Sequence, residues 1–146
     1  MDKDTQYMQI ALNEAKLALS ENEVPIGAVV VCHDKIIAKA HNQTETLNDA
    51  TAHAEMLAIT GAMASLGSKY LKDCTLYVTV EPCFMCAGAI HWSQISRIVY
   101  GAKDPKKGYS NYSNKIFHSK IKVISGVLEN DCADVLSLFF KTKLRS

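Results

Sequence analysis

The sequence predicts an α/β fold in which helices cover both faces of a mixed, five-stranded sheet. Five short apolar segments rich in β-branched residues alternate along the chain with segments whose apolar residues recur at helical spacing. The 146 residues suffice for one domain with a buried core. The apolar fraction of 48% and the charged fraction of 21% are typical of globular proteins. We therefore expect a single layered domain over residues 1–146.

The first expected elements are a helix and a β-hairpin. Apolar residues at helical spacing over the first twenty positions predict an amphipathic helix. Two strands are expected next, over residues 24–32 and 35–41, and His33-Asp34 forms a short link between them. The residues that define the helix are Met8, Ala11, Leu12, Ala15, Ala18 and Leu19.

The middle of the chain predicts two helices on either side of a strand. After a polar loop at residues 42–50, small and apolar residues over 54–62 predict a helix that lies close against the sheet. Residues 76–80 form the third expected strand. Pro82 then favours the start of a further helix, because a proline lacks only a donor that the first turn leaves unpaired. Helical spacing continues in this segment to Ile90.

The last part of the chain predicts two short strands and a closing helix. The strands are expected over residues 95–100 and 121–124, with a polar connection rich in lysine and serine between them. The closing helix is indicated by apolar residues at helical spacing, namely Cys132, Val135, Leu136, Phe139 and Phe140.

The cysteines indicate a metal site or a nucleophile and not a disulfide framework. The chain has five cysteines, an odd number, and two of them, Cys83 and Cys86, lie three positions apart beside a proline. The other three, Cys32, Cys74 and Cys132, lack such a pairing, so we interpret them as small apolar core residues.

Charge and localisation signals are limited. The net charge of +1 hides an acidic first part and a basic end, since residues 97–146 carry ten Lys or Arg against four Asp or Glu. A polyanionic partner and an ordinary uneven surface both account for this asymmetry. No apolar stretch reaches the length of a membrane span, and the acidic start MDKDTQYMQI does not resemble a secretory signal. We expect a cytoplasmic protein that does not contact a membrane.

Two motifs, each at an expected helix start, predict a catalytic zinc site. Cysteines three apart on one helix share a face, so the sulfur atoms of Cys83 and Cys86 can reach one ion. Helix N-termini favour the thiolates that zinc requires. His53 supplies a third ligand, and three protein ligands leave a fourth position for water. H-x-E followed at a distance by P-C-x-x-C is the signature of zinc deaminases that act on nucleobases.

Glu55 is the expected proton carrier of this site. It lies two positions after His53, so it can stand beside the metal without being a ligand. We expect Glu55 to take a proton from the zinc-activated water, to protonate the ring nitrogen beside the attacked carbon and then to protonate the leaving amine. Taken one at a time, these residues would instead be a buried histidine, inert thiols and a surface carboxylate. Their combination favours the metal.

Four segments of the chain closely resemble the bacterial tRNA-specific adenosine deaminases. They are VPIGAVVV at residues 24–31, TAHAEM at 51–56, LYVTVEPCFMCAGAI at 76–90 and RIVYGAKD at 97–104. The resemblance spans nearly the whole chain. It implies the three-layer α/β/α cytidine deaminase-like fold, a homodimer and one Zn²⁺ per subunit. It also implies conversion of adenosine to inosine at the wobble position of a tRNA anticodon.

The resemblance also carries over substrate contacts residue by residue. Asn42 matches an asparagine that hydrogen-bonds the bound base, and residues 25–27 match the pocket wall that faces the flipped nucleotide. Asp104 matches a residue near the neighbouring sugar, and Lys103 stands where the family usually has arginine. The closing helix, with Phe139, matches a segment that packs beside the anticodon loop. The complete set of expected substrate contacts is Pro25, Ile26, Gly27, Asn42, Ala54, Pro82, Lys103, Asp104 and Phe139.

Each of these contacts also has a plain structural interpretation. Asn42 can be an ordinary loop residue, residues 25–27 the start of a buried strand, and Asp104 a solvated surface charge. Phe139 can be a core residue, and the basic residues near it can serve only the helix dipole. The chain departs from the family at Leu138, which replaces an acidic residue, and at residues 109–120, which are shorter than their counterpart.

Three functions therefore compete at this point. The resemblance favours a tRNA adenosine deaminase that works by zinc-activated hydroxide. A deaminase of a free base such as guanine or cytosine would use the same four residues at its catalytic centre. A zinc-stabilised binding module without catalysis is the third, although Glu55 argues against it.

Overall fold

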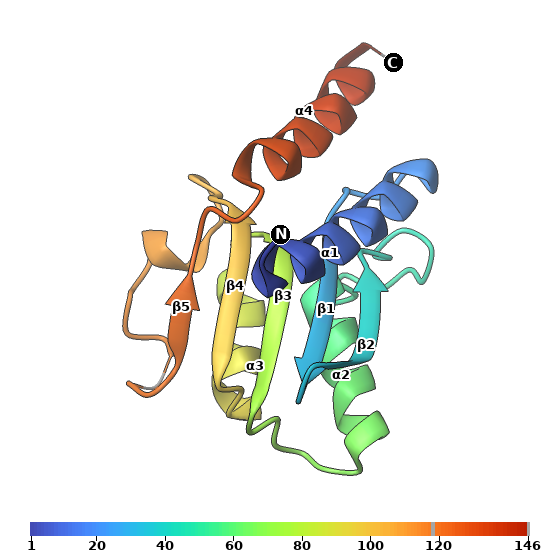
Figure 1. The fold of residues 1–146 in the computed structure, drawn as a ribbon. Coiled ribbons are helices and arrows are strands. Elements are labelled where there is room, and N and C mark those ends of the chain that lie inside the picture. Colours follow the sequence, from blue (N-terminus) through green and yellow to red (C-terminus); the bar gives the residue numbers. More distant parts are fainter. Residues whose placement is uncertain (118, 146) are drawn as a thin grey trace.

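A mixed five-stranded sheet forms the centre of the molecule (Figure 1). The computed structural model describes residues 1–117 and 119–145, with side chains through residue 142. The strand order is β2-β1-β3-β4-β5; β1 is antiparallel to β2 and β3, and β4 is parallel to β3 and β5. The strands are β1 (Gly27–Cys32), β2 (Lys35–His41), β3 (Cys74–Val80), β4 (Arg97–Ala102) and β5 (Lys122–Ile124). The predicted five-stranded mixed sheet is confirmed.

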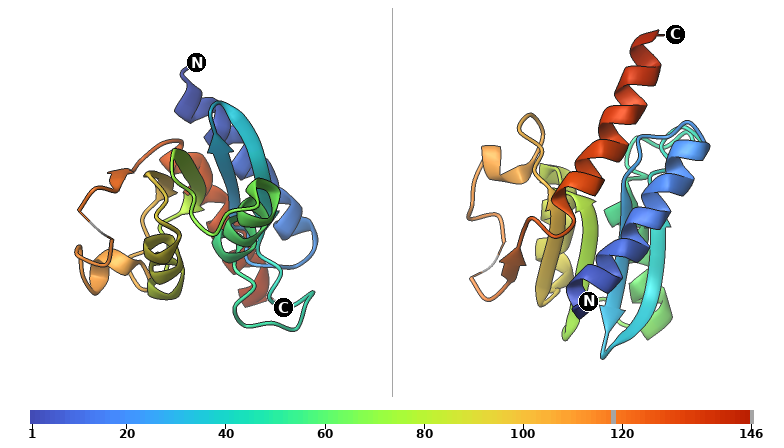
Figure 2. Two further views of the ribbon diagram at one scale, coloured as in Figure 1. Left: turned by 90° about the horizontal axis from the view of Figure 1, so that it is seen from below. Right: turned by 45° about the horizontal axis from the view of Figure 1, so that its top comes forward.

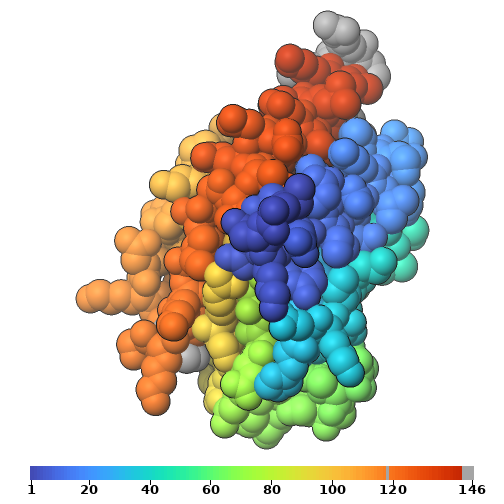
Figure 3. All heavy atoms as spheres, viewed as in Figure 1, coloured from blue at the N-terminus to red at the C-terminus, as the bar shows by residue number. Residues whose placement is uncertain are grey.

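Helices cover both faces of the sheet, which gives the three layers that the sequence predicts. Figures 1 and 2 show α1 and α4 on one face and α2 and α3 on the other. In the space-filling view, α1 and α4 lie side by side across the front (Figure 3). Among the residues described, no helix has the length and apolar character needed to cross a membrane. The helices are α1 (Lys3–Ser20), α2 (Ala54–Leu66), α3 (Phe84–Ser93) and α4 (Glu129–Arg145).

The core has two halves because side chains of a strand alternate between the faces of a sheet. Val30 and Val78 pack with α2 and α3, whereas Val29 and Val99 pack with α1 and α4. The three cysteines assigned to the core are all buried, as predicted: Cys32, Cys74 and Cys132.

The hairpin forms at the predicted link, but its first strand starts later than expected. His33 and Asp34 both have positive φ, of 50° and 62°, as a tight two-residue hairpin turn requires. Strand β1 begins at Gly27 and not at residue 24, because the Ile26 amide turns back to the Val24 carbonyl at 2.9 Å. The glycine is required by packing, since a Cβ at this position would lie 2.0 Å from the carbonyl oxygen of Ala11 in α1.

The segments with the predicted site residues meet where β2, β3 and β4 end and β1 begins. We call this end of the strands the upper edge of the sheet, as it is drawn in Figure 1. Because β1 is antiparallel to its two neighbours, the residues before β1 lie beside those that follow β2 and β3. The Gly27 amide bonds to Thr79 Oγ1 near the end of β3, at 3.2 Å. The parallel strand β4 ends at the same edge. In α/β proteins, sites form where the carboxyl ends of parallel strands meet.

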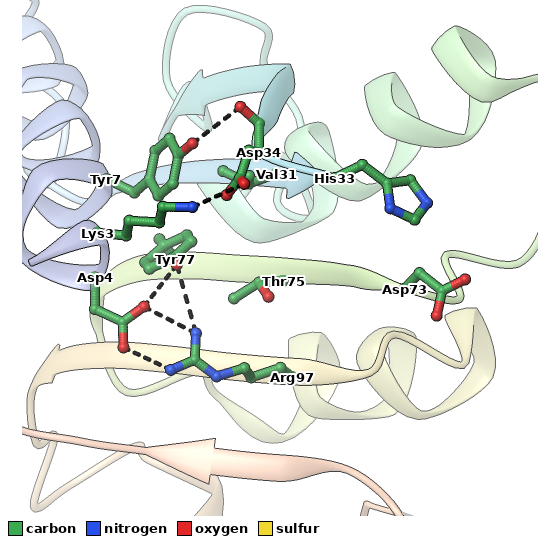
Figure 4. A pocket seen from close by; sticks show the side chains of 10 residues that line it. All are labelled: Lys3, Asp4, Tyr7, Val31, His33, Asp34, Asp73, Thr75, Tyr77 and Arg97. Carbon is green, nitrogen blue, oxygen red and sulfur yellow. Dashed lines mark hydrogen bonds and ion pairs between the residues drawn. The ribbon is translucent and has the colours of Figure 1, made fainter.

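The opposite edge carries a paired ionic cluster beside an open hollow of about 290 Å³ (Figure 4). The Arg97 guanidinium donates to the Asp4 carboxylate, 2.8 Å from Nη1 to Oδ1, and the Tyr77 hydroxyl donates to the same oxygen at 2.7 Å. Lys3 pairs with Asp34 at 2.8 Å. The hydrogen bond from Arg97 holds the pKa of Asp4 below its usual value. This cluster ties the start of α1 to β3, to β4 and to the turn between β1 and β2.

Candidate active site

The three predicted metal ligands lie at the starts of two helices on the same face of the sheet. His53 is the N-cap of α2 and Cys83 is the N-cap of α3, both with extended backbone. Neither side chain caps its own helix, so both point away to a common centre. Cys86 lies in the first turn of α3. Pro82 precedes the cap residue and is not in the first turn as expected, because the chain remains extended through Cys83.

These three side chains are spaced as ligands of one zinc ion. The His53 Nδ1 atom is 3.6 Å from Cys83 Sγ and 3.5 Å from Cys86 Sγ. All three ligand atoms lie within 4.8 Å of one another. Tetrahedral zinc with ordinary Zn–S and Zn–N bonds would separate a nitrogen from a sulfur by about 3.6 Å. The donor set of one imidazole and two thiols therefore fits zinc in both chemistry and spacing, and it leaves one position free for water.

The helix N-termini and the neighbouring side chains shift the pKa values of both cysteine thiols. The N-termini of α2 and α3 both point at this centre and favour negative charge there. The Cys86 thiol donates to Cys83 and, together with the bond to His53, lowers the pKa of Cys83 to about 4. The same contact and burial raise the pKa of Cys86. A metal ion that binds both sulfur atoms displaces the protons that the thiols still carry.

Glu55 lies in the first turn of α2 with its side chain buried beside the ligands. Its exposed fraction is 3%. Burial raises the pKa of Glu55 to about 7, against the lowering effect of a backbone hydrogen bond and of the nearby His53. A carboxyl group with a pKa near neutrality can both accept and donate a proton at physiological pH. The proton-carrier role predicted for Glu55 requires such a group.

Asn42 has a buried acceptor without a partner. Its side chain is buried, and its Oδ1 has no hydrogen-bond donor among the described residues. An orphaned amide oxygen destabilises a folded protein, so its retention suggests a ligand that donates to it. Asn42 follows β2, and backbone bonds join its segment to Ile26 and, through Gln43, to Ala52 next to His53.

The other predicted contacts, at residues 25–27, 54 and 82, are buried or half-buried. Pro25 is buried, Ile26 is half-buried, and Gly27 has the backbone of α1 on one side. Ala54 and Pro82, which are chain neighbours of metal ligands, are both buried.

The predicted contacts after β4 lie in a loop of residues 103–110, which we call the 103–110 loop. Lys103 is exposed and Asp104 is half-buried. The Asp104 carboxylate accepts from the backbone amides of Lys106 and Lys107, both at 3.0 Å. It therefore shapes the loop that carries these lysines.

The closing helix α4 lies on the opposite face of the sheet from the metal ligands. Phe139 is buried and meets Phe140 edge to face, with ring centroids 5.3 Å apart. Phe140 is half-exposed. The basic side chains of Lys143 and Arg145 lie outside the described residues.

Two buried carboxylates at this edge were not found by sequence reasoning. Glu23 is fully buried and accepts from the backbone amides of Glu45 and Thr46, at 3.1 and 2.7 Å, and so holds the loop that follows Asn42. Glu81 is also buried and bonds the 103–110 loop. The two residues share one sequence feature, a nearby proline within an apolar stretch. Glu81 directly precedes Pro82, and Glu23 lies two positions before Pro25.

Comparison with known proteins agrees with this geometry. The family model for the cytidine and deoxycytidylate deaminase zinc-binding region matches residues 1–102. The tRNA-specific adenosine deaminase of Bacillus subtilis (strain 168) is 48% identical over 146 residues, covering 97% of this chain and 91% of the relative. That of Agrobacterium fabrum is 44% identical, covering 98% and 97%.

Solved structures give the same assignment. A structure from a study of A-to-I editing by tRNA:A34 deaminases at the wobble position superimposes with a TM-score of 0.85 at 44% identity, covering 90% of this chain and 99% of the other. The guanine deaminase of Nitrosomonas europaea superimposes with a TM-score of 0.84 at 25% identity, covering 95% and 85%. With a His-Cys-Cys group that can hold zinc and a buried glutamate beside it, the chain belongs to the cytidine and deoxycytidylate deaminase family, on the branch of the tRNA-specific adenosine deaminases.

Proposed function

We propose that this enzyme hydrolyses adenosine to inosine at the wobble position of a tRNA anticodon and releases ammonia. The observation that carries the proposal is the buried Glu55 beside the ligand set of His53, Cys83 and Cys86. The high identity over almost the whole length of proteins named tRNA-specific adenosine deaminases supports this substrate.

The side chains of the site divide the reaction between them. His53, Cys83 and Cys86 would hold the zinc ion, which when bound makes a water molecule nucleophilic near neutral pH. Glu55 accepts a proton from the attacking water and passes one to the ring nitrogen next to the attacked carbon. It then takes the second proton from the hydroxyl group now bonded to that carbon and passes it to the amino group, so that ammonia leaves and a carbonyl remains. A pKa near 7 suits a group that alternates between these roles.

Asn42 and the loops around it would hold the nucleotide. The unpaired Oδ1 of Asn42 offers an acceptor to the flipped nucleotide, and the Asn42 backbone amide is bonded to the Ile26 carbonyl beside it. The exposed Lys103, Lys106 and Lys107 lie at the same edge, where they can neutralise phosphates. Base flipping into a small pocket is how such enzymes reach the atom they modify. Contacts beyond the base would then select RNA.

An anticodon stem-loop with adenosine at the wobble position tests this function. We expect zinc-loaded protein to convert that adenosine to inosine, measured by mass spectrometry of the digested RNA. If protein that carries one zinc ion per chain forms no inosine in this RNA, the proposal is refuted. Guanine, cytosine and free adenine belong in the same panel, because guanine deaminases share this fold. Faster ammonia release from a free base than from RNA would favour the alternative substrate class.

A homodimer is the assembly we propose for this enzyme. Phe84 and Trp92 lie two turns apart on α3 with exposed fractions of 62% and 77%, and the exposed Tyr112 ring is 5.5 Å from that of Phe84. Large apolar side chains grouped on a surface indicate a partner, and a two-fold contact would cover both copies. Sedimentation equilibrium should find a dimer that Trp92→Glu dissociates. A monomeric parent protein would exclude this assembly.

A tRNA substrate also implies that the enzyme works in the cytoplasm.

A further inference from the structure

Glu81 is a buried carboxylate for which the deamination chemistry has no use. It is the first residue after β3 and directly precedes the Pro82-Cys83 pair that begins the metal-binding segment. Only 4% of it is exposed. A buried carboxylate requires hydrogen-bond donors, so its partners indicate what it does.

All described hydrogen bonds to this carboxylate come from the two ends of the 103–110 loop. The Asp104 amide donates to Oε1 at 3.1 Å, and the Ser110 amide and hydroxyl both donate to Oε2, at 3.0 and 2.5 Å. The Tyr109 amide also donates to the Pro82 carbonyl, at 2.9 Å. Glu81 therefore fastens the loop at both ends to the strand end that leads into the zinc ligands.

The contact leaves no room for a side chain on the loop. A Cβ at Gly108 would lie 2.3 to 2.5 Å from the carboxylate atoms of Glu81. The backbone of Gly108 has φ −62° and ψ 144°, which every L-residue adopts readily. The glycine is thus needed for the close approach of Glu81 and not for an unusual backbone conformation.

Hydrogen bonds extend from Glu81 to the lysines of the loop. Glu81 holds the Asp104 amide, and the Asp104 carboxylate in turn holds the amides of Lys106 and Lys107. Detaching Glu81 would release the turn that presents these cations at the edge of the sheet where the metal ligands lie.

We propose that Glu81, with Gly108 as its close-fitting partner, is a positioning residue that fixes the 103–110 loop for binding of the RNA substrate. The inference rests on the proposed function, because the loop is expected to contact nucleotides beside the target base. Glu81 is not among the residues that would contact the base or the zinc ion. Its loss should weaken RNA binding and leave the chemical step intact.

Two variants disturb the same contact in different ways. Glu81→Gln places an amide N–H₂ group against backbone donors, and Gly108→Ala pushes a methyl group into the carboxylate. For zinc-loaded protein and the anticodon stem-loop, each should raise KM about tenfold, as expected when charge-assisted hydrogen bonds are lost, and leave kcat within about twofold. Fluorescence anisotropy with labelled stem-loop should show the same loss of affinity, and zinc content should remain one per chain.

Matched controls separate this effect from general damage. Gly61→Ala adds a methyl group 3.5 Å from Ala38, which is an ordinary contact, and Glu129→Gln removes an exposed carboxylate. Both controls should keep the parent KM and kcat. An unchanged KM in Gly108→Ala, or a fall in kcat without a rise in KM, overturns the proposal, even if Glu81→Gln does not fold.

Amide hydrogen exchange distinguishes failure of this proposal from failure of the proposed function. In Glu81→Gln, the amides of Asp104 and Ser110 should exchange faster than in the parent protein, while those of β3 remain protected. Unchanged protection at both amides overturns the anchoring role. A parent protein that binds zinc but converts no stem-loop overturns the proposed function instead.

Discussion

The Cys86 sulfur lies 3.5 Å from His53 Nδ1, although 33 positions separate the two residues in the chain. Each sits at the start of its own helix, and α2 and α3 pack against each other on one face of the sheet. The N-terminal ends of both helices therefore act on the same small volume. Stability of the site should depend on a ligand from each helix.

Removal of one thiolate should abolish both metal binding and activity. Cys83→Ala leaves only two protein ligands, which hold zinc poorly and open the site to solvent. We expect less than about a tenth of the parent zinc content after dialysis, as measured by atomic absorption, and no deamination. Cys132→Ala serves as the control, because it removes a buried cysteine that is not among the predicted ligands. This variant should keep one zinc ion per chain. Full zinc content in Cys83→Ala would remove this residue from the ligand set.

Removal of the buried carboxylate should separate metal binding from turnover. Glu55→Gln keeps the size of the side chain but cannot carry the proton, so we expect kcat to fall by about 10²- to 10⁴-fold. Zinc content should equal that of the parent protein, because Glu55 is not among the ligands. Rapid-quench kinetics beside elemental analysis would measure both. Parent-like turnover in this variant would revive the idea of a non-catalytic zinc module.

Asn42→Ala should impair substrate use more than stability. The parent protein already leaves Oδ1 of Asn42 without a donor, so removing that oxygen relieves an unpaired buried group. We expect kcat/KM for the stem-loop to fall by about 10²-fold, and the free energy of unfolding to change by less than about 1 kcal/mol. Urea unfolding of the zinc-loaded variant would test the second part. A loss of several kcal/mol would mean that Asn42 has a structural role.

The Asp4–Arg97 pair should stabilise the protein only above acidic pH. The hydrogen bond from Arg97 lowers the pKa of Asp4 in the folded protein below its unfolded value of about 4. Its contribution is therefore complete well above pH 4 and is lost as the pH falls through the lowered value. Arg97→Met should reduce the free energy of unfolding by about 1 kcal/mol at pH 7. This difference should shrink below pH 4.

Urea unfolding of zinc-free parent and variant at pH 7, 5, 4 and 3 measures this dependence. The control is Asp4→Asn, in which the effect of Arg97→Met should be small at every pH. A difference between parent and Arg97→Met that persists unchanged at pH 3 would assign it to packing of the arginine side chain and not to the ion pair.

Sequence alone determined the local structure and the chemistry of the metal. Period-two and helical apolar patterns depend on near neighbours in the chain, so they gave the strands, the helices and the mixed sheet. The candidate metal ligands could be predicted in the same way, because His53 and the Cys83-to-Cys86 spacing belong to short motifs at helix starts. Resemblance to a family added the substrate.

Only the tertiary structure decided how the site is framed. Glu23 and Glu81 look like surface acids in a linear sequence, yet their donors come from residues more than twenty positions away. Likewise, the start of β1 at Gly27 follows from the approach of Ala11, and the burial of Phe139 beside an exposed Phe140 follows from where α4 packs. Hydrogen bonding and close packing of this kind depend on distances between remote segments, which no local pattern encodes.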